Sequence, residues 1–180
     1  ESACPRSLLK KVVQECEDLG FKPLFAQEFE WFNFKGTPNE LHESDFQNLH
    51  PISPGMFGYS ILRSTLNQPY FDDLFNLLAE FNIPVEGLHT ETGPGVIEAS
   101  IVYDDILSAA DKAILFKTAV KEIAYKHEFM ATFMAKWNPK LPGCGGHIHQ
   151  SLWDIEGKKN LFFDKSRQHK MSKLMEHFVA

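Results

Sequence analysis

The chain has 180 residues, 43% hydrophobic and 13% aromatic, which suffices for one ordinary core and fits one domain or part of a larger one. Its net charge of -6 argues against nucleic acid or an anionic membrane surface as the main partner. No apolar run approaches the ~20 residues of a membrane span, and the amino end lacks the basic-then-apolar pattern of a signal peptide.

The three cysteines show no paired spacing, which favours free thiols in a reducing compartment, and we expect the cytoplasm. The sequence begins with Glu1 rather than Met, and it stops within an apparently helical stretch at residues 177–180. We therefore expect residues 1–180 to be a fragment of a longer protein.

The first elements follow from periodicity and from helix-breaking residues. Hydrophobic residues recur with helical spacing after Pro5, and Gly20 ends this predicted helix. The aromatic-rich segment Lys22–Phe34 predicts a strand. Residues 36–58 predict a long irregular connection, which is unusual unless it serves a site or an interface. A helix is predicted over Tyr70–Phe81.

The longest predicted helix runs over Ile106–Lys126, capped by Asp104 or Asp105. Its expected buried stripe comprises Ala109, Ala113, Phe116, Val120 and Ile123. The other predicted elements are strands over Val85–Thr92, Val96–Tyr103, Phe129–Ala135 and His147–Trp153, and a helix from Ser172. Because strands and helices mix without regular alternation, the sequence favours the α+β class.

The first chemical signal is the pair Glu28 and Glu30 within an aromatic strand. Side chains alternate along a strand, so both carboxylates share one face while Phe29 and Trp31 share the other. Two carboxylates on one face repel each other unless a cation lies between them. A solvated edge strand explains the pair about as well when this segment is taken alone.

The second signal is the pair Glu91 and Glu98. The two residues are symmetric about the segment Gly93–Val96, so a hairpin with that centre predicts them as direct cross-strand neighbours, with Cβ atoms roughly 5 Å apart. A divalent ion would turn the repulsion of this pair into a binding site, because Mg²⁺ and Mn²⁺ prefer carboxylate oxygens. A purely structural hairpin remains the alternative.

The third signal is the segment from Gly143 to Ser151. A strand here presents His147, His149 and Ser151 on one face, and the preceding glycines let the backbone approach a ligand closely. Alternating histidines also occur by chance on surfaces, and no cysteine pair makes this a zinc finger. Taken together, four carboxylates and a histidine suit two Mg²⁺ or Mn²⁺ ions, which bind nucleotide phosphates during phosphoryl transfer.

These three segments, Glu28-Phe29-Glu30, Glu91–Glu98 and Gly143–Leu152, resemble in order and spacing three motif blocks of the glutamine synthetase family. Residues 131–134 also resemble the strand before that family's glycine loop. The resemblance covers nearly the whole chain. It implies the central part of a catalytic domain with an antiparallel sheet and flanking helices, in a ring-shaped homo-oligomer whose site forms between subunits.

The resemblance also implies roles for individual residues. One metal would be held by Glu30, Glu91 and Glu98, and the metal on the ATP phosphates by Glu28 and His147. The positions implied to contact the nucleotide are Glu86, Tyr103, His149 and Ser151, and the one implied to contact the amino-acid substrate is Gly143. In such enzymes ATP phosphorylates the γ-carboxylate of glutamate, and ammonia then attacks the acyl phosphate.

One departure from the family pattern bears on the substrate. The family usually has Asn before the glycine that Gly143 matches, and Pro142 has no side-chain amide to offer. Relatives that glutamylate polyamines or ethanolamine are therefore an alternative. A non-catalytic relative such as lengsin is another, although all four motif carboxylates are kept. The family's amino-terminal domain and the carboxyl-terminal part of its catalytic domain lie outside this chain, so we expect the fragment alone to be inactive.

Overall fold

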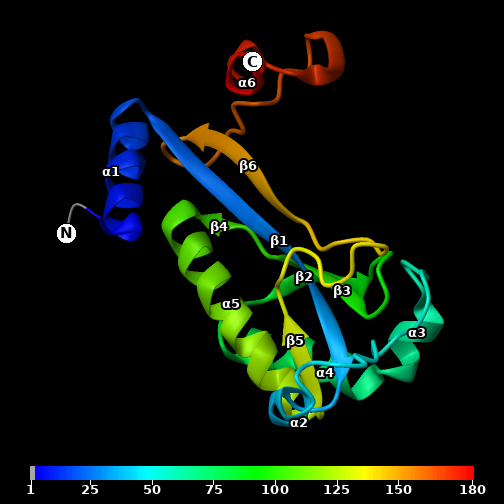
Figure 1. Ribbon diagram of the computed structural model, residues 1–180. Helices are drawn as coiled ribbons and strands as arrows, with labels where there is room; N and C mark the ends of the chain where they lie inside the picture. Colours follow the sequence, from blue (N-terminus) through cyan, green and yellow to red (C-terminus); the bar gives the residue numbers. More distant parts are fainter. Residues whose placement is uncertain (1–2) are drawn as a thin grey trace. The chain divides into compact units, whose positions relative to one another are not determined.

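The computed structural model describes residues 3–180, which fall into two compact units (Figure 1). The first unit comprises the chain up to Ala26 together with Tyr103–Asp111 and Ile148–Ala180. The second comprises Gln27–Val102 and Lys112–His147. Strand β1 (Phe21–Lys35), helix α5 (Ile106–Lys126) and strand β6 (Gly146–Asp154) contribute residues to both.

The second unit contains the main part of an antiparallel sheet. Strand β3 (Val96–Ile101) lies between β2 (Val85–Thr90) and β1, and the short strand β5 (Phe129–Thr132) also pairs with β1. All of these pairs are antiparallel. Helices flank the sheet (Figure 1), which confirms the predicted α+β class.

Helices α4 (Gln68–Glu80) and α5 bury their apolar stripes against one face of the sheet. The ring of Phe116 on α5 lies 5.6 Å from that of Phe29 and 5.7 Å from that of Trp31. All five residues of the stripe predicted for α5 are buried. Burial of such aromatic area is a principal source of the stability of this unit.

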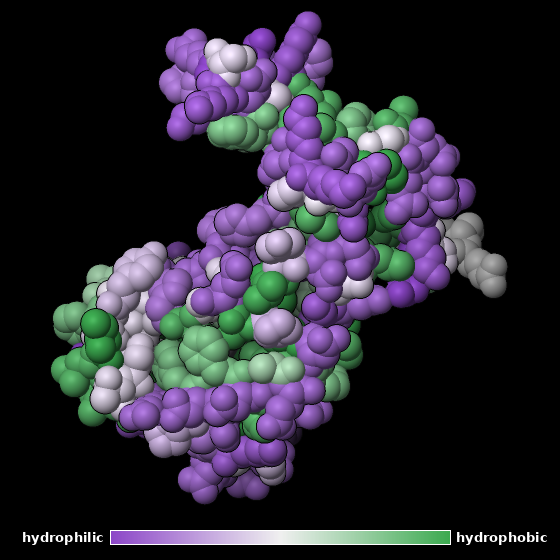
Figure 2. Space-filling view, turned by 180° about the vertical axis from the view of Figure 1, so that it is seen from behind, coloured by the Kyte–Doolittle hydropathy of each residue, from purple (hydrophilic) through white to green (hydrophobic). Residues whose placement is uncertain are grey.

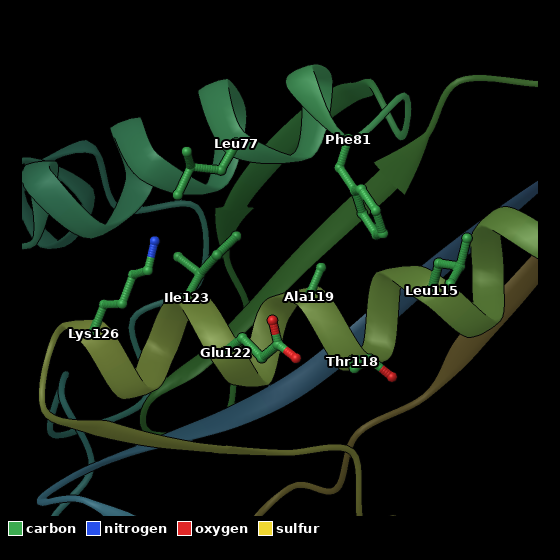
Figure 3. A pocket seen from close by; sticks show the side chains of 8 residues that line it. All are labelled: Leu77, Phe81, Leu115, Thr118, Ala119, Glu122, Ile123 and Lys126. Atoms are coloured by element: carbon green, nitrogen blue, oxygen red, sulfur yellow. The ribbon is translucent and has the colours of Figure 1, made fainter.

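An apolar groove lies between α4 and α5 (Figure 3). Its lining consists of Leu77, Phe81, Leu115, Thr118, Ala119, Glu122, Ile123 and Lys126. Hydrophobic side chains also reach the surface at the edge formed by α3 (Ile61–Leu66), as Figure 2 shows. Neither surface gathers the convergent polar groups expected of a catalytic site.

The first unit is built around helix α1 (Pro5–Asp18) and the outer parts of β1 and β6. Arg6 donates two hydrogen bonds to the carboxylate of Asp111, at 2.9 and 2.7 Å. Strand β4 (Asp104–Asp105) pairs with Leu24 and Phe25 of β1. A 3-10 turn (Gln168–Lys170) and helix α6 (Lys173–Val179) follow, the latter capped by Ser172.

Most predicted elements are present within one or two residues, but two helices were missed. Residues 36–58, predicted to be irregular, contain α2 (Pro38–Glu43), which begins with a capping box formed by Thr37 and Glu40. Helix α3 was not predicted either. Of the two proposed caps of α5, Asp105 is the one whose carboxylate accepts hydrogen bonds from the first turn.

Among residues 3–180, no helix combines the length and the hydropathy needed to cross a membrane.

Candidate metal and substrate site

The two carboxylates of β1 lie on the face of the sheet opposite the helices. Phe29 and Trp31 pack into the core with α5, so the intervening Glu28 and Glu30 project the other way. This alternation was predicted from the sequence and is confirmed. The strand is paired on both sides, with β3 on one side and with β5 and β6 on the other, so it is not the solvated edge strand considered as the alternative.

Glu98 occupies the middle of this face. Its cross-strand partner on β1 is Glu30, and its partner on β2 is His89. The prediction that Glu91 lies directly opposite Glu98 is therefore wrong. The main chain turns within Thr92–Gly95, where Val96 donates to the Gly93 carbonyl at 3.0 Å, and the Glu91 amide donates to the Val96 carbonyl at 2.9 Å.

The error in register is two residues, and a shift of two leaves a side chain on the same face. Glu91 thus stays close to Glu98 although it is not its direct partner. Oxygen and nitrogen atoms of His89, Glu91 and Glu98 lie within 4.8 Å of one another. The like-charged pair that does lie directly opposite is Glu30 and Glu98.

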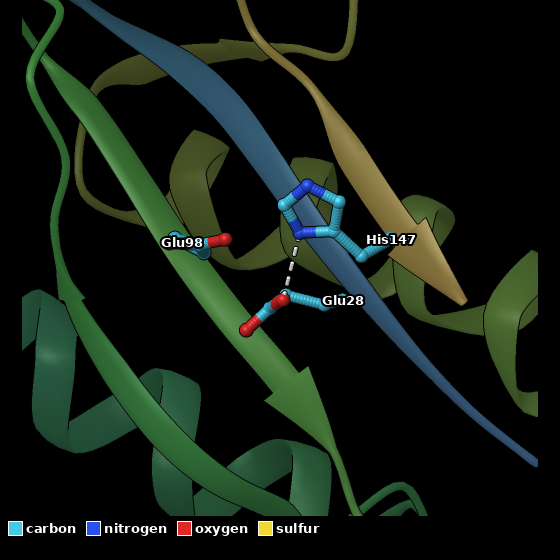
Figure 4. A group of neighbouring side chains, drawn as sticks. All are labelled: Glu28, Glu98 and His147. Atoms are coloured by element: carbon cyan, nitrogen blue, oxygen red, sulfur yellow. Dashed lines mark hydrogen bonds and ion pairs between the residues drawn. The ribbon is translucent and has the colours of Figure 1, made fainter. Parts of the chain in front are cut away.

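A second cluster joins Glu98 to Glu28 and His147, whose ligand-type atoms also lie within 4.8 Å of one another (Figure 4). Each residue comes from a different strand: β1, β3 and β6. His147 Nδ1 lies 3.0 Å from one Glu28 oxygen, and the Ser100 hydroxyl donates to the other at 2.6 Å. Glu98 therefore belongs to both clusters.

Two residues at this site were missed in the sequence. His89 Nε2 lies 2.9 Å from Glu98, and the ring of Tyr59 stacks on that of His89 at 4.8 Å between centroids. The Tyr59 hydroxyl donates to Glu91. His89 could have been found, because it precedes Glu91 by two in a strand. Tyr59 had no such signal, since it lies in an irregular segment with a positive φ of 57°.

The pKa shifts show how the carboxylates affect one another. Burial, reinforced by the charge of Glu28, raises the pKa of Glu98. For Glu91, burial is outweighed by hydrogen bonds from Thr92 and Tyr59, so its pKa is lowered. The hydrogen bond to Glu28 raises the pKa of His147. Clustered carboxylates of this kind, with imidazole beside them, fit a hard divalent cation.

The glycine loop lies directly against the carboxylates. The Gly145 amide donates to Glu30 Oε2 at 2.9 Å, and the Gly145 carbonyl accepts from the Glu30 amide at 3.4 Å. A Cβ at Gly146 would lie 3.2 Å from the Glu28 carbonyl oxygen, and one at Gly143 would lie 2.5 Å from that of Ala135. The close approach of backbone to backbone therefore requires glycine at position 143 and leaves little room for a side chain at position 146.

The four residues predicted to contact the nucleotide are distributed over the two units. Glu86 is exposed on β2 in the second unit. In the first unit, Tyr103 and His149 are exposed, while the Ser151 hydroxyl donates to the Leu24 carbonyl at 3.3 Å. That hydroxyl also accepts from Trp153 Nε1 at 3.0 Å, which fixes its position.

This domain of sheet and helices gathers carboxylates and a histidine from three strands, which are donors that divalent cations prefer. The family model described as "Glutamine synthetase, catalytic domain" matches residues 2–180. The chain belongs to the glutamine synthetase family.

Individual relatives agree with this assignment. The chain is 49% identical over 177 residues to "Type-1 glutamine synthetase 2" of Dictyostelium discoideum, covering 98% of this chain and 34% of that protein. It is 34% identical to a glutamate–isopropylamine ligase of Pseudomonas sp, covering 98% and 38%. A cryo-electron-microscopy structure of Plasmodium falciparum glutamine synthetase superposes with a TM-score of 0.78 at 25% identity, covering 98% and 39%. The chain therefore spans somewhat more than a third of the length of these relatives.

Proposed function

We propose that the whole protein is an ATP-dependent ligase that joins ammonia to glutamate through a γ-glutamyl phosphate. The observation that carries the proposal is the meeting of Glu28, Glu98 and His147 on one face of the sheet, within the fold of this family. A carboxylate is a poor acceptor for an amine, so ATP must supply the leaving group. A site that accepts phosphates and carboxylates together needs clustered cation ligands.

Two Mg²⁺ or Mn²⁺ ions would be held here, one by Glu28 and His147 and the other by Glu30, Glu91 and Glu98. When bound, they would neutralise the anionic phosphates and carboxylate as these meet. The donor set supports this assignment, because Glu98 is buried between Glu30 and His89, and the like charge of Glu28 repels the charge of Glu98. Removing like-charge repulsion is what a cation accomplishes at such a site.

The remaining assignments concern groups that bind rather than react. Gly143 is exposed in the glycine loop and would contact the amino-acid substrate through its main chain. Glu86, Tyr103, His149 and Ser151 would contact ATP. The intact protein would be a homo-oligomeric ring with sites between subunits. Residues 1–180 would form one part of the catalytic domain of each subunit. Each of the three cysteines is free, in keeping with our assignment to the cytoplasm.

A second candidate is the same chemistry with another amine or acid. Pro142 carries no amide next to Gly143, and losing a polar group that meets a substrate charge costs about 1.5–3 kcal/mol, or roughly 10- to 150-fold in affinity. The relative named for isopropylamine supports such a variant, as would polyamine or ethanolamine substrates. A non-catalytic, lengsin-like role is less well supported, because Glu28, Glu30, Glu91 and Glu98 are all present.

The test is a coupled assay of ADP release by the full-length protein with glutamate, ammonia and a panel of alkyl and polyamines. We expect release that requires glutamate, an amine and a divalent cation together. Absence of release with every pair would reject the ligase. For the second candidate, Pro142→Asn should raise activity with glutamate and ammonia relative to the best alternative pair.

A further inference from the structure

The site face of β1 changes character halfway along the strand. Glu28, Glu30, Phe32 and Phe34 alternate onto this one face, and the two phenylalanines are fully buried, with ring centroids 6.2 Å apart. With Leu41 and Val96 they form a small apolar cluster separate from the main core. We call this set of four buried residues the satellite cluster. It adjoins the carboxylates along the strand.

The segment 135–145 contacts both the acidic and the aromatic part of this face. At its carboxyl end the Cys144 amide donates to the Ala135 carbonyl at 2.9 Å, which closes the segment into a loop. The Gly145 amide donates to Glu30 Oε2, also at 2.9 Å. Cys144 packs against the satellite cluster, and burial raises the pKa of its thiol to about 12. The thiol therefore stays neutral and acts as an apolar contact.

The interior of the loop is held differently. Within the described chain, the hydrogen bonds of residues 136–142 stay inside the segment, where Leu141 and Lys140 both donate to Asn138. The ring of Trp137 packs against the rest of the unit. It meets Phe34 edge-on at 5.1 Å between centroids and Phe32 at 6.5 Å. Its indole Nε1 is buried and has no acceptor among residues 3–180.

We propose that Trp137 is the positioning residue that holds the glycine loop on β1, and so keeps the Gly145 amide beside Glu30 and fixes the Gly143 main chain in the loop. The proposal rests on the proposed function, in which this loop contacts the acid substrate. Within residues 3–180 the ring acts by packing alone, because its N–H finds no acceptor there. Phenylalanine should therefore replace it well, and alanine should not.

The experiment compares full-length Trp137→Ala and Trp137→Phe with the control Met130→Ala. Met130 packs against the same satellite cluster, but from β5 rather than from the loop. Loop opening is followed by tryptic cleavage of the Lys140–Leu141 bond, which none of the substitutions alters and whose Lys140 is exposed. We expect Trp137→Ala to speed this cleavage by about tenfold or more, with wild-type rates in the other two variants.

In turnover, Trp137→Ala should raise KM for the acid substrate by about tenfold while kcat changes by less than about twofold, with rescue by Trp137→Phe. Equal cleavage of wild type and Trp137→Ala would overturn the proposal, and so would equal effects of Trp137→Ala and Met130→Ala. If the alanine variant does not fold, Trp137→Leu carries the same comparison. If Trp137→Ala speeds cleavage but the wild-type protein turns over no amine, the role of Trp137 in holding the loop would stand and the proposed ligase function would be rejected.

Discussion

The two faces of β1 differ in chemistry, one aromatic and the other acidic, although their residues alternate along one strand. On the core face, Phe29 and Trp31 meet the aromatic ring of Phe116. On the site face, Glu28 and Glu30 lie beside Glu98, three carboxylates brought together by strand pairing. The core face is complete within the second unit. On the site face, the three carboxylates repel one another, and the proposed cations would remove that repulsion.

Stability and metal binding therefore depend on opposite faces of the same strand. Apolar burial lowers the free energy of the folded state whatever is bound, whereas clustered carboxylates raise it until a cation arrives. Changes on the core face should therefore cost stability and leave metal affinity nearly unchanged. Changes on the site face should weaken metal affinity without lowering the stability of the metal-free protein.

The largest expected effect is that of Phe116→Ala on the core face. Deleting a buried phenylalanine ring that contacts both Phe29 and Trp31 should lower the free energy of unfolding by about 3–5 kcal/mol. Urea unfolding of the full-length protein measures it, with Mn²⁺ affinity expected to stay within about twofold. A loss below about 1 kcal/mol would show that the core face is not packed as described.

A smaller loss is expected for Asn33→Ala, on the same face. The buried side-chain oxygen Oδ1 of Asn33 accepts from Trp31 Nε1 at 3.0 Å and from the Tyr70 hydroxyl at 2.8 Å, and the side-chain Nδ2 donates to the Gly95 carbonyl at 3.0 Å. Leaving two buried donors weakly bonded should cost about 2–4 kcal/mol. Tyr70→Phe is the matched control and should cost about 1 kcal/mol, because it removes one donor completely. Equal losses in the two variants would contradict the network.

A substitution on the site face should raise the free energy of unfolding, whereas those on the core face lower it. Glu98 has a raised pKa in the folded state because of burial and the charge of Glu28, so its ionised form destabilises the metal-free protein. Glu98→Gln should therefore raise the free energy of unfolding of the metal-free full-length protein near pH 7. The gain should shrink as the pH falls from the folded pKa to below the ordinary carboxyl pKa, since Glu98 is then protonated in both states.

Urea titrations at a series of pH values check this, with Mn²⁺ present in a parallel set. A metal-free Glu98→Gln protein that is less stable than wild type at pH 7 would contradict the account. A gain that persists undiminished at low pH would contradict it as well.

Strand and helix periodicity made much of the fold, and the two faces of β1, predictable from the sequence. The alternation of Glu28, Phe29, Glu30 and Trp31 predicted both faces of β1, and the apolar spacing of residues 106–126 predicted α5 with its buried stripe. These features depend on local spacing, which a single sequence carries. Helix α2 could also have been predicted, because Thr37 and Glu40 have the spacing of a capping box.

Register and loop contacts were harder, for physical reasons. In the hairpin after Glu91, the partner of Glu98 lies two residues away from the predicted one, because the turn geometry decides pairing and several turns fit Gly93-Pro94-Gly95. Tyr59 reaches the site from an irregular segment in which the Tyr59 and Ser60 amides both donate to Thr90, a contact without periodic signal. Glu91 nonetheless lies close to Glu98, because a shift of two preserves the face.

The most direct test of the central claim is calorimetric titration of the metal-free full-length protein with Mn²⁺. We predict two ions per subunit. Glu91→Ala and His147→Ala should each weaken or abolish one of the two binding events, by at least about tenfold in affinity, because each removes a donor from one of the two clusters. Phe116→Ala, a change on the core face, should retain both. Stoichiometry and affinity unchanged in both Glu91→Ala and His147→Ala would contradict the claim that this face of the sheet is a two-metal site.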